Sequence, residues 1–258
     1  RKIIRAYLAG KSTPKLASFY KTSQKAVINV LRRNSIPRRP RGQGARRYTC
    51  DHSFFNTIDT EAKAYWLGFI AADGSIVRNC VTINLQQRDR NHLKRFLHDI
   101  SATYRIYDWL RKGNRSSAIV ISSTAMRRAL ARYGIVPKKT LTIRWPDLSN
   151  NLLRHFLRVY IDGDGGWGVY FRKPPLYSQH IFRVCGYKHF LQTMQEFLMT
   201  HCSLNRIKLY SGKRSPHIYN LIYSGKQQVS RIAHYLYLNA TVCLFRKYKL
   251  LQSHNLLG

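Results

Sequence analysis

Residues 64–76, AYWLGFIAADGSI, join a nearly unbroken apolar run to a single carboxylate, Asp73, which Gly74 follows. The run has the length and composition of a buried helix. The Asp-Gly pair is typical of a helix end, because glycine tolerates the left-handed turn that stops a helix. A second stretch, LRVYIDGDG at 157–165, ends in the same way at Asp164. The whole chain has only 11 acidic residues, so two carboxylates at matching helix ends indicate a function.

The charge of the chain indicates a polyanionic partner. Its 258 residues include 45 Lys and Arg, and the formal net charge is +34. Such a charge suits nucleic acid, so double-stranded DNA is the leading partner. No apolar run has the length of a bilayer span, and the N-terminal apolar stretch is too short for a secretory signal. We expect an intracellular protein without a membrane partner, in bacterial or phage-host cytoplasm or in an organelle.

The sequence argues against two other kinds of site. The five cysteines are scattered and form no C-x-x-C pair, which argues against a disulfide framework and a cysteine-based zinc site. The stretch GDGGWG at 163–168 matches G-x-G-x-x-G, but it follows a helix rather than a strand. A dinucleotide site is therefore not expected.

Residues 1–37 have the pattern of three short helices. Thr13 is a suitable N-cap and Pro14 a suitable first-turn residue for the second helix, and Ser23 is a suitable N-cap for the third. Two helices joined by a tight turn resemble a helix-turn-helix DNA-binding domain, and a plain helical cap on the following domain is the alternative. The polar face of the third helix gives the expected DNA contacts Gln24, Lys25 and Asn29.

Residues 38–50 form a basic linker rich in Arg, Pro and Gly, which cannot build a core. Arginines alternating with Pro and Gly suit an extended arm along a phosphate backbone or in a minor groove. The expected contacts are Arg38, Arg39 and Arg41. A solvated tether is the alternative.

The remaining chain repeats one order of elements, helix–strand–strand–helix–strand–strand–helix. The two copies are residues 51–137 and 151–258, and a linker at 138–150 joins them. In the first copy, strand 80–87 alternates apolar and polar residues; in the second, strands are expected at 180–186, 205–210 and 218–224. The pattern predicts an α+β class: a tandem duplicated αββαββα fold with pseudo-two-fold symmetry and two saddle-shaped sheets.

The motifs WLGFIAADG (66–74) and LRVYIDGDG (157–165) resemble the two signature motifs of LAGLIDADG homing endonucleases, in the single-chain, two-motif type preceded by a helix-turn-helix. The resemblance covers about residues 48–258. It implies that both saddles face DNA and that the protein is a hydrolase acting as a monomer. The implied reaction is metal-dependent double-strand cleavage with 3′ overhangs at a long asymmetric target, which promotes intron mobility.

The chemistry of the two helix ends agrees with this resemblance. Asp73 and Asp164 can project beyond the last turn beside free carbonyls, for which Ala72 and Gly163 are the candidates. Carboxylate and carbonyl oxygens at the negative end of a helix dipole attract Mg²⁺. We expect Mn²⁺ to substitute for it and Ca²⁺ to support DNA binding only.

Further catalytic residues are implied by the resemblance alone. Gln87 matches the place of a polar residue that orders water, and Lys226 lies near the place of the family's active-site lysine. Asp162 has Ala71 as its counterpart, so a hydrogen bond near the helix end is expected of it rather than catalysis. Val159 stands where the motif usually has glycine, as at Gly68, and its bulk is expected to shift the helix crossing.

The outward residues of the strands and their neighbours are the expected readers of DNA bases. They are Thr82, Asn84, Gln86, Arg88 and Arg183. Two alternatives remain open. One is an RNA maturase that binds its host intron RNA, and the other is a transcription regulator that binds DNA without cutting it.

Overall fold

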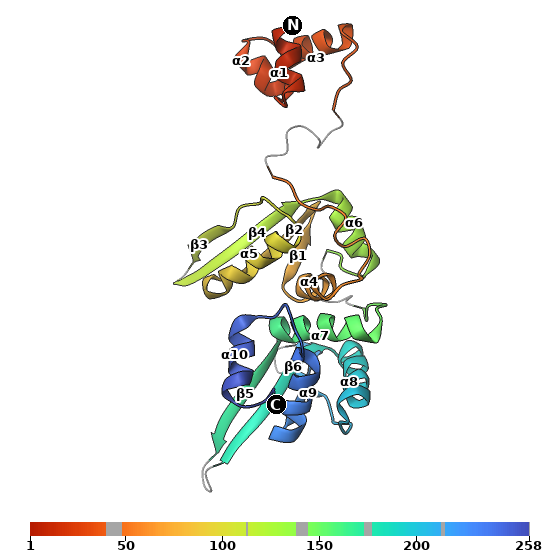
Figure 1. The fold of residues 1–258 in the computed structure, drawn as a ribbon, viewed down its shortest axis with the longest axis vertical. Coiled ribbons are helices and arrows are strands. Elements are labelled where there is room, and N and C mark those ends of the chain that lie inside the picture. The colour runs from red at the N-terminus through yellow and green to blue at the C-terminus, as the bar shows by residue number, and fades with distance from the viewer. Residues whose placement is uncertain (40–47, 112, 138–143, 173–176, 213–214, 258) are drawn as a thin grey trace. The chain divides into compact units, whose positions relative to one another are not determined.

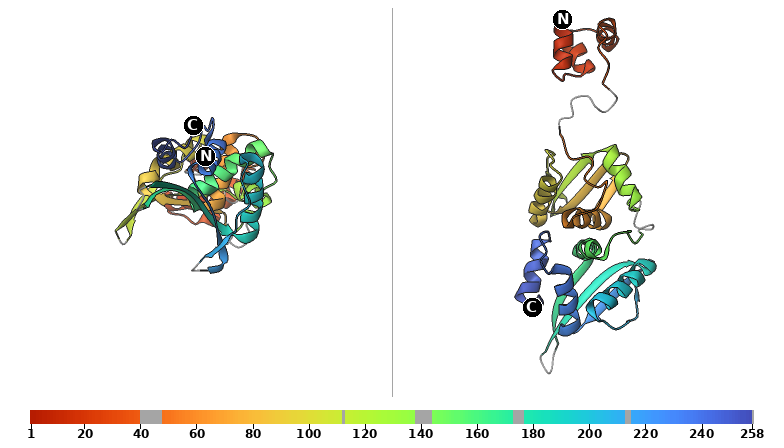
Figure 2. Two further views of the ribbon diagram at one scale, coloured as in Figure 1. Left: turned by 90° about the horizontal axis from the view of Figure 1, so that it is seen from below. Right: turned by 45° about the vertical axis from the view of Figure 1, so that its right-hand side comes forward.

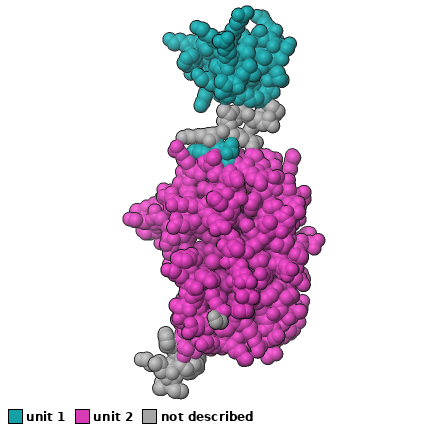
Figure 3. Space-filling model, viewed as in Figure 1, with its two compact units in different colours: residues 1–49 teal, residues 50–258 magenta. Residues whose placement is uncertain are grey.

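The computed structural model describes residues 1–39, 48–111, 113–137, 144–172, 177–212 and 215–257. The chain forms two compact units, residues 1–49 and residues 50–258 (Figure 1, Figure 3). The first unit has a small apolar core of its own. Its buried residues are Tyr7, Leu16, Ala17, Val27 and Leu31.

Three helices build the first unit: α1 (Lys2–Leu8), α2 (Thr13–Phe19) and α3 (Gln24–Arg33). The Ser23 hydroxyl accepts the amide of Ala26 at 3.1 Å, so the predicted N-cap of α3 is confirmed. The predicted cap of α2 is wrong by one residue. Ser12 is the N-cap residue, without a side-chain capping bond, and Thr13 and Pro14 both lie in the first turn of the helix.

The second unit contains the two copies of the repeat, and its order of elements confirms the predicted duplicated αββαββα fold. The first copy is α4 (Glu61–Ala72), β1 (Gly74–Val77), β2 (Cys80–Gln86), the 3₁₀ turn η1 (Gln87–Asp89), α5 (Arg90–Asp99), β3 (Tyr107–Arg111), β4 (Asn114–Ser122) and α6 (Thr124–Arg132). The second is α7 (Asn150–Asp164), β5 (Gly165–Arg172), β6 (Tyr177–Tyr187), α8 (Lys188–Cys202), β7 (Tyr210–Gly212), β8 (Ser215–Ser224) and α9 (Lys226–Tyr237).

Each copy has one four-stranded antiparallel sheet, with the strand orders β1-β2-β4-β3 and β5-β6-β8-β7. Helices cover one face of each sheet: α5 contacts β2 and β4, and α8 and α9 contact β6 and β8 (Figure 2). Along β2 the buried Val81 and Ile83 alternate with polar residues, as expected for a sheet with one face toward the core. The opposite face of each sheet remains available to a ligand.

Two elements differ from the sequence prediction. The strand expected at 205–210 begins only at Tyr210, because the carbonyl of Ile207 accepts the side chain of buried Gln195 at 3.0 Å instead of a strand partner. The final helix α10 (Phe245–Ser253) was not predicted, since it has no counterpart in the repeat. Within the described residues no helix is long and apolar enough to cross a membrane.

Candidate nuclease site

The site is built on the packing of α4 against α7, which lie at the junction of the two copies (Figure 1). A Cβ placed on Gly68 would come within 2.4 Å of both the Phe156 carbonyl and Val159 Cγ1. Gly68 lies four residues before the last residue of α4, and Val159 lies five residues before the last residue of α7, so equivalent parts of the two helices are in contact. A Cβ on Gly163 would lie 2.8 Å from Ala72 Cβ.

Later residues of α4 contact later residues of α7: Gly68 lies against Phe156 and Val159, and Ala72 lies against Gly163. The two helices therefore run in the same direction and end side by side. Asp73 directly follows α4, and Asp164 is the last residue of α7. Both acid positions therefore lie at one end of the helix pair. Val159 occupies the space that Gly68 leaves open, so the pair of one small and one larger residue keeps the helices in close contact.

The carboxylate of Asp73 lies over the Cα of Gly163. A Cβ added there would be 3.0 Å from Asp73 Oδ2 and 3.3 Å from Cγ. Only glycine at 163 leaves this space beside the carboxylate. The side chain of Asp164 lies outside the described part of the structure, and its main chain carries the helix into β5.

The predicted left-handed turn at the two glycines is wrong. Neither Gly74 nor Gly165 has a positive φ, and both begin strands, β1 and β5. They are required for a different reason: a Cβ would lie 2.7 Å from the carbonyl oxygen of Ile70 in the first case and 2.6 Å from that of Ile161 in the second. Glycine thus lets each chain turn from helix to strand directly over the last helical turn.

The residues present suit a hard divalent cation. Carboxylate and main-chain oxygens are the ligands that Mg²⁺ and Ca²⁺ prefer, and the Asp73 carboxylate lies close to the main chain of Gly163. Among the described side chains no group of three or more His, Cys, Asp or Glu gathers to hold a metal. A cation here would complete its coordination with main-chain, water or phosphate oxygens beside the carboxylates.

The structure brings one of the two other predicted catalytic residues to this end of the sheets. Gly74 pairs with Ile83 across β1 and β2, so Gln87, which follows β2, lies at the same end of its sheet as Asp73. It does not bring Lys226 to Asp164. Ser224, the last residue of β8, pairs with Ile181, which pairs with Gly168. The Lys226 main chain is therefore displaced along the sheet, away from the end of α7.

The predicted DNA-facing residues lie mostly at the surface. Asn84, Gln86, Arg88 and Arg183 are exposed, and Thr82 is half-buried on the same face of β2 as Asn84. Exposed aromatic and apolar side chains extend this face across the first sheet. They are Tyr107, Trp109 and Val120. Polar, basic and apolar groups together give a surface that can contact both phosphates and base edges.

In the first unit Gln24 and Lys25 are exposed at the start of α3, and Asn29 is half-buried one turn later. Gln24 Nε2 donates to Thr13 Oγ1 at 3.1 Å, and Asn29 Oδ1 accepts from Arg32 at 3.3 Å. These contacts hold the polar face of the helix in place.

The three predicted linker arginines differ in their surroundings. Arg38 is exposed. Arg39 folds back on α1: its guanidinium lies 4.2 Å from the centre of the Tyr7 ring and donates to the Gly10 carbonyl at 3.1 Å. Arg39 therefore closes the helical unit. Arg41 lies outside the described residues.

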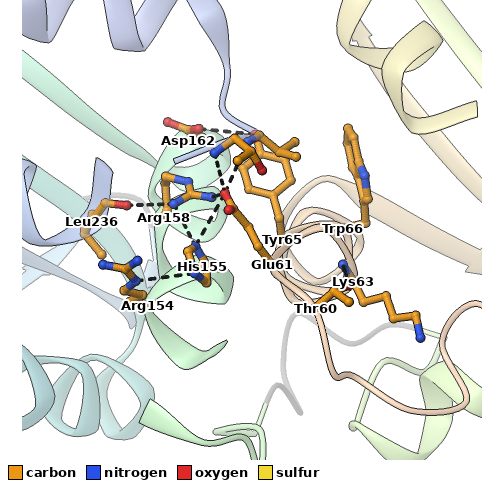
Figure 4. A network of polar contacts seen from close by, with 12 residues as sticks. Thr60, Glu61, Lys63, Tyr65, Trp66, Arg154, His155, Arg158, Asp162 and Leu236 are labelled. Atoms are coloured by element: carbon orange, nitrogen blue, oxygen red, sulfur yellow. Dashed lines mark hydrogen bonds and ion pairs between the residues drawn. The ribbon is translucent and has the colours of Figure 1, made fainter. Parts of the chain in front are cut away.

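A buried ionic network beneath the site was not predicted (Figure 4). Arg158, fully buried on α7, donates to Glu61 of α4 at 2.6 Å and to the Leu236 carbonyl at 2.8 Å. Burial alone would raise the pKa of Glu61, but the charge of Arg158 and the amides of Thr241 and Val242 lower it. The network joins α4, α7 and the end of α9. Its signal in the sequence was Arg158, a charged residue inside the apolar motif at 157–165, whereas Glu61 lies at the first position of α4, before the motif at 66–74.

Asp162 belongs to the same region and is buried. Its Oδ2 accepts the amide of Leu244 at 3.1 Å, and its Oδ1 accepts the hydroxyl of Tyr237. Burial raises the pKa of Asp162 despite the nearby charge of Lys247. A hydrogen-bonding role was predicted. The partners lie in α9, in the segment before α10 and in α4, where the hydroxyl of Tyr65 donates to Oδ2 at 3.4 Å.

Comparison with known proteins identifies the architecture. No family model matches the sequence, and no curated protein matches it. The structure is similar to that of the LAGLIDADG meganuclease I-CpaMI bound to uncleaved DNA, with a TM-score of 0.55 and 10% identity over 75% of this chain and 90% of that chain. It is also similar to the LAGLIDADG homing endonuclease I-GzeII in complex with its DNA target, with a TM-score of 0.52 and 12% identity over 78% and 94% of the two chains. The chain has the two-copy fold of the LAGLIDADG homing endonucleases.

Proposed function

We propose that this protein is a sequence-specific endodeoxyribonuclease that makes double-strand breaks in duplex DNA with the help of a divalent cation. The observation that carries the proposal is the parallel packing of α4 and α7, which places Asp73 and Asp164 at one end of the helix pair. Its fold is similar to that of meganucleases bound to DNA, and its charge of +34 suits a polyanion.

Each copy of the repeat would supply one acid, and each acid would act on one strand of the duplex. A pseudo-two-fold axis between α4 and α7 would coincide with the local dyad of the DNA, so each acid position faces one scissile phosphate. The cation, with Mg²⁺ as the expected one, would activate water and stabilise the leaving 3′ oxygen. Asp73 supplies a carboxylate ligand, and Gln87 lies at the same end of the sheet to order solvent.

The exposed faces of the two sheets would bind the DNA on either side of the cut. Arg183 and Arg88 offer charge, and Asn84 and Gln86 offer amide groups suited to adenine edges. The helical unit, with Gln24 and Lys25 exposed on α3, would lengthen the target. The same proposal includes three further points: the protein acts as a monomer, its breaks have 3′ overhangs, and the breaks spread its host intron.

The test incubates the protein with a library of duplexes in Mg²⁺ and in Ca²⁺ and sequences the ends. Discrete paired ends in Mg²⁺ only, lost in Asp73→Asn and Asp164→Asn, would support the proposal. Asp59→Asn is the matched control, because this exposed carboxylate pairs with Lys63 at the start of α4, away from the site. Binding without cleavage would favour a regulator, and selective binding of intron RNA would favour a maturase.

A further inference from the structure

The helix α10 lies outside the repeat and contacts both copies. Arg246 Nε donates to both carboxylate oxygens of Asp89, at 3.1 and 3.0 Å. Asp89 is buried and ends η1, the turn that begins with Gln87. A residue of the second copy's C-terminal extension therefore holds the turn that carries Gln87 in the first copy.

The next residue holds the other half of the site. Lys247 is buried, and its ammonium donates to the carbonyl of Ile161 at 3.0 Å and to that of Gly165 at 2.8 Å. These two carbonyls flank Asp164, one in the last turn of α7 and one at the start of β5. Carbonyls at a helix C-terminus lack partners within the helix, and a cation there is favourable.

The segment before α10 has further anchors besides these two side chains. The amide of Leu244 donates to Asp162 Oδ2 at 3.1 Å, and the amides of Thr241 and Val242 donate to Glu61 Oε1 at 2.8 and 3.2 Å. Loss of one ammonium group would therefore leave α10 docked.

We propose that Arg246 and Lys247 are positioning residues for the metal-dependent site: Arg246 holds Gln87 through Asp89, and Lys247 holds the helix-to-strand turn that carries Asp164. This inference rests on the proposed function. Neither residue takes part in the chemistry. Each fixes the main chain that presents a reacting side chain, so a single turn of α10 keeps both halves in register.

The test compares Lys247→Met with Lys249→Met. Both variants lose one ammonium group and keep an unbranched side chain of similar length, but Lys249 is exposed and lies over the Phe245 ring. Tb³⁺ is the probe of the metal site, followed by luminescence sensitised by nearby aromatic residues. Hydrogen exchange of the peptide covering 160–168 reports the order of the turn. For Arg246→Gln, hydrogen exchange is measured in the same way on the peptide covering 85–90.

We expect Lys247→Met to weaken Tb³⁺ binding about tenfold or more and to speed exchange at 160–168, because a group that orients a metal ligand commonly contributes this much to affinity. Lys249→Met should change neither. Arg246→Gln should speed exchange at 85–90 and leave 160–168 unchanged.

The inference would be overturned if the Lys247 and Lys249 variants had the same Tb³⁺ affinity and the same exchange rate at 160–168. So would tighter Tb³⁺ binding by Lys247→Met, since that result would make the lysine a competing charge rather than a positioning group. If the wild-type protein binds no Tb³⁺ and cuts no DNA, the proposed function fails. The exchange measurement still decides whether Lys247 orders the turn.

Discussion

Replacing Glu61 by glutamine tests the buried ion pair between the two motif helices. Arg158 is fully buried, and Glu61 lies 2.6 Å from its guanidinium. The other partners of the Arg158 guanidinium are the Leu236 carbonyl at 2.8 Å and His155 Nδ1 at 2.9 Å. Burial and Arg158 lower the pKa of His155 to about 4, so it is neutral at pH 7. Neither partner offers a negative charge.

Glu61→Gln keeps the volume but removes the carboxylate that pairs with the buried Arg158 guanidinium. Removing one partner of a buried pair typically costs about 3–5 kcal/mol, and we expect this loss in the free energy of unfolding. Arg158→Met removes the buried charge itself. Glu61 is partly exposed and keeps two main-chain amides, so this variant should lose only about 1–3 kcal/mol.

The double variant should be more stable than Glu61→Gln alone, by about 2 kcal/mol, because no uncompensated charge remains. Urea unfolding at pH 7, followed by tryptophan fluorescence, measures all four proteins. The four tryptophans, at 66, 109, 145 and 167, all lie in residues 50–258, so the signal reports the unit that contains the pair. Strictly additive losses, or a loss below about 1 kcal/mol for Glu61→Gln, would refute this reasoning.

Three further predictions concern packing, pH and salt. Gly68→Ala places a methyl group 2.4 Å from the Phe156 carbonyl and should cost about 3 kcal/mol in urea unfolding; Gly166→Ala, where a Cβ meets nothing within 4 Å, is the control, and equal losses would contradict the close packing. Burial lowers the pKa of His92 to about 3 from 6.5. The unfolded chain therefore binds a proton that the folded chain does not, and stability should fall as pH falls from about 6.5 to about 3, by up to about 1.4 kcal/mol per pH unit. In urea unfolding at acid pH, the stability of His92→Gln should fall less steeply with pH than that of the wild type. The same slope for both proteins would contradict this prediction. Affinity for duplex DNA, measured by fluorescence anisotropy, should drop about 10³-fold between about 50 and about 200 mM salt, and a flat profile would exclude phosphate contacts as its main source.

Most of the order of helices and strands could be predicted because it depends on local sequence patterns. The alternation in β2 and the apolar faces of the helices each depend on residues close in sequence. Repetition then strengthened weak signals, since a strand that is indistinct in one copy has a clearer counterpart in the other. The strand expected at 205–210 failed because a distant side chain, Gln195, took the carbonyl that a strand partner needed.

The candidate site was predictable only in part. The acids at Asp73 and Asp164 stand out against a basic chain. Lys226 was implied only by the family resemblance, and the register of β8 carries its main chain away from the site. The role of Gly74 was also misjudged. Its φ is not positive, and glycine is needed because the Ile70 carbonyl lies where a Cβ would be.

The sequence by itself determined the duplication, the two acid-bearing helices and the basic surface, because periodicity, motif spacing and charge are properties of the chain. Only the tertiary structure decided that α4 and α7 run in the same direction, that Arg158 and Glu61 pair between them, and that α10 returns to contact both copies. These features depend on contacts between residues that lie 86 to 157 positions apart, which local pattern does not encode.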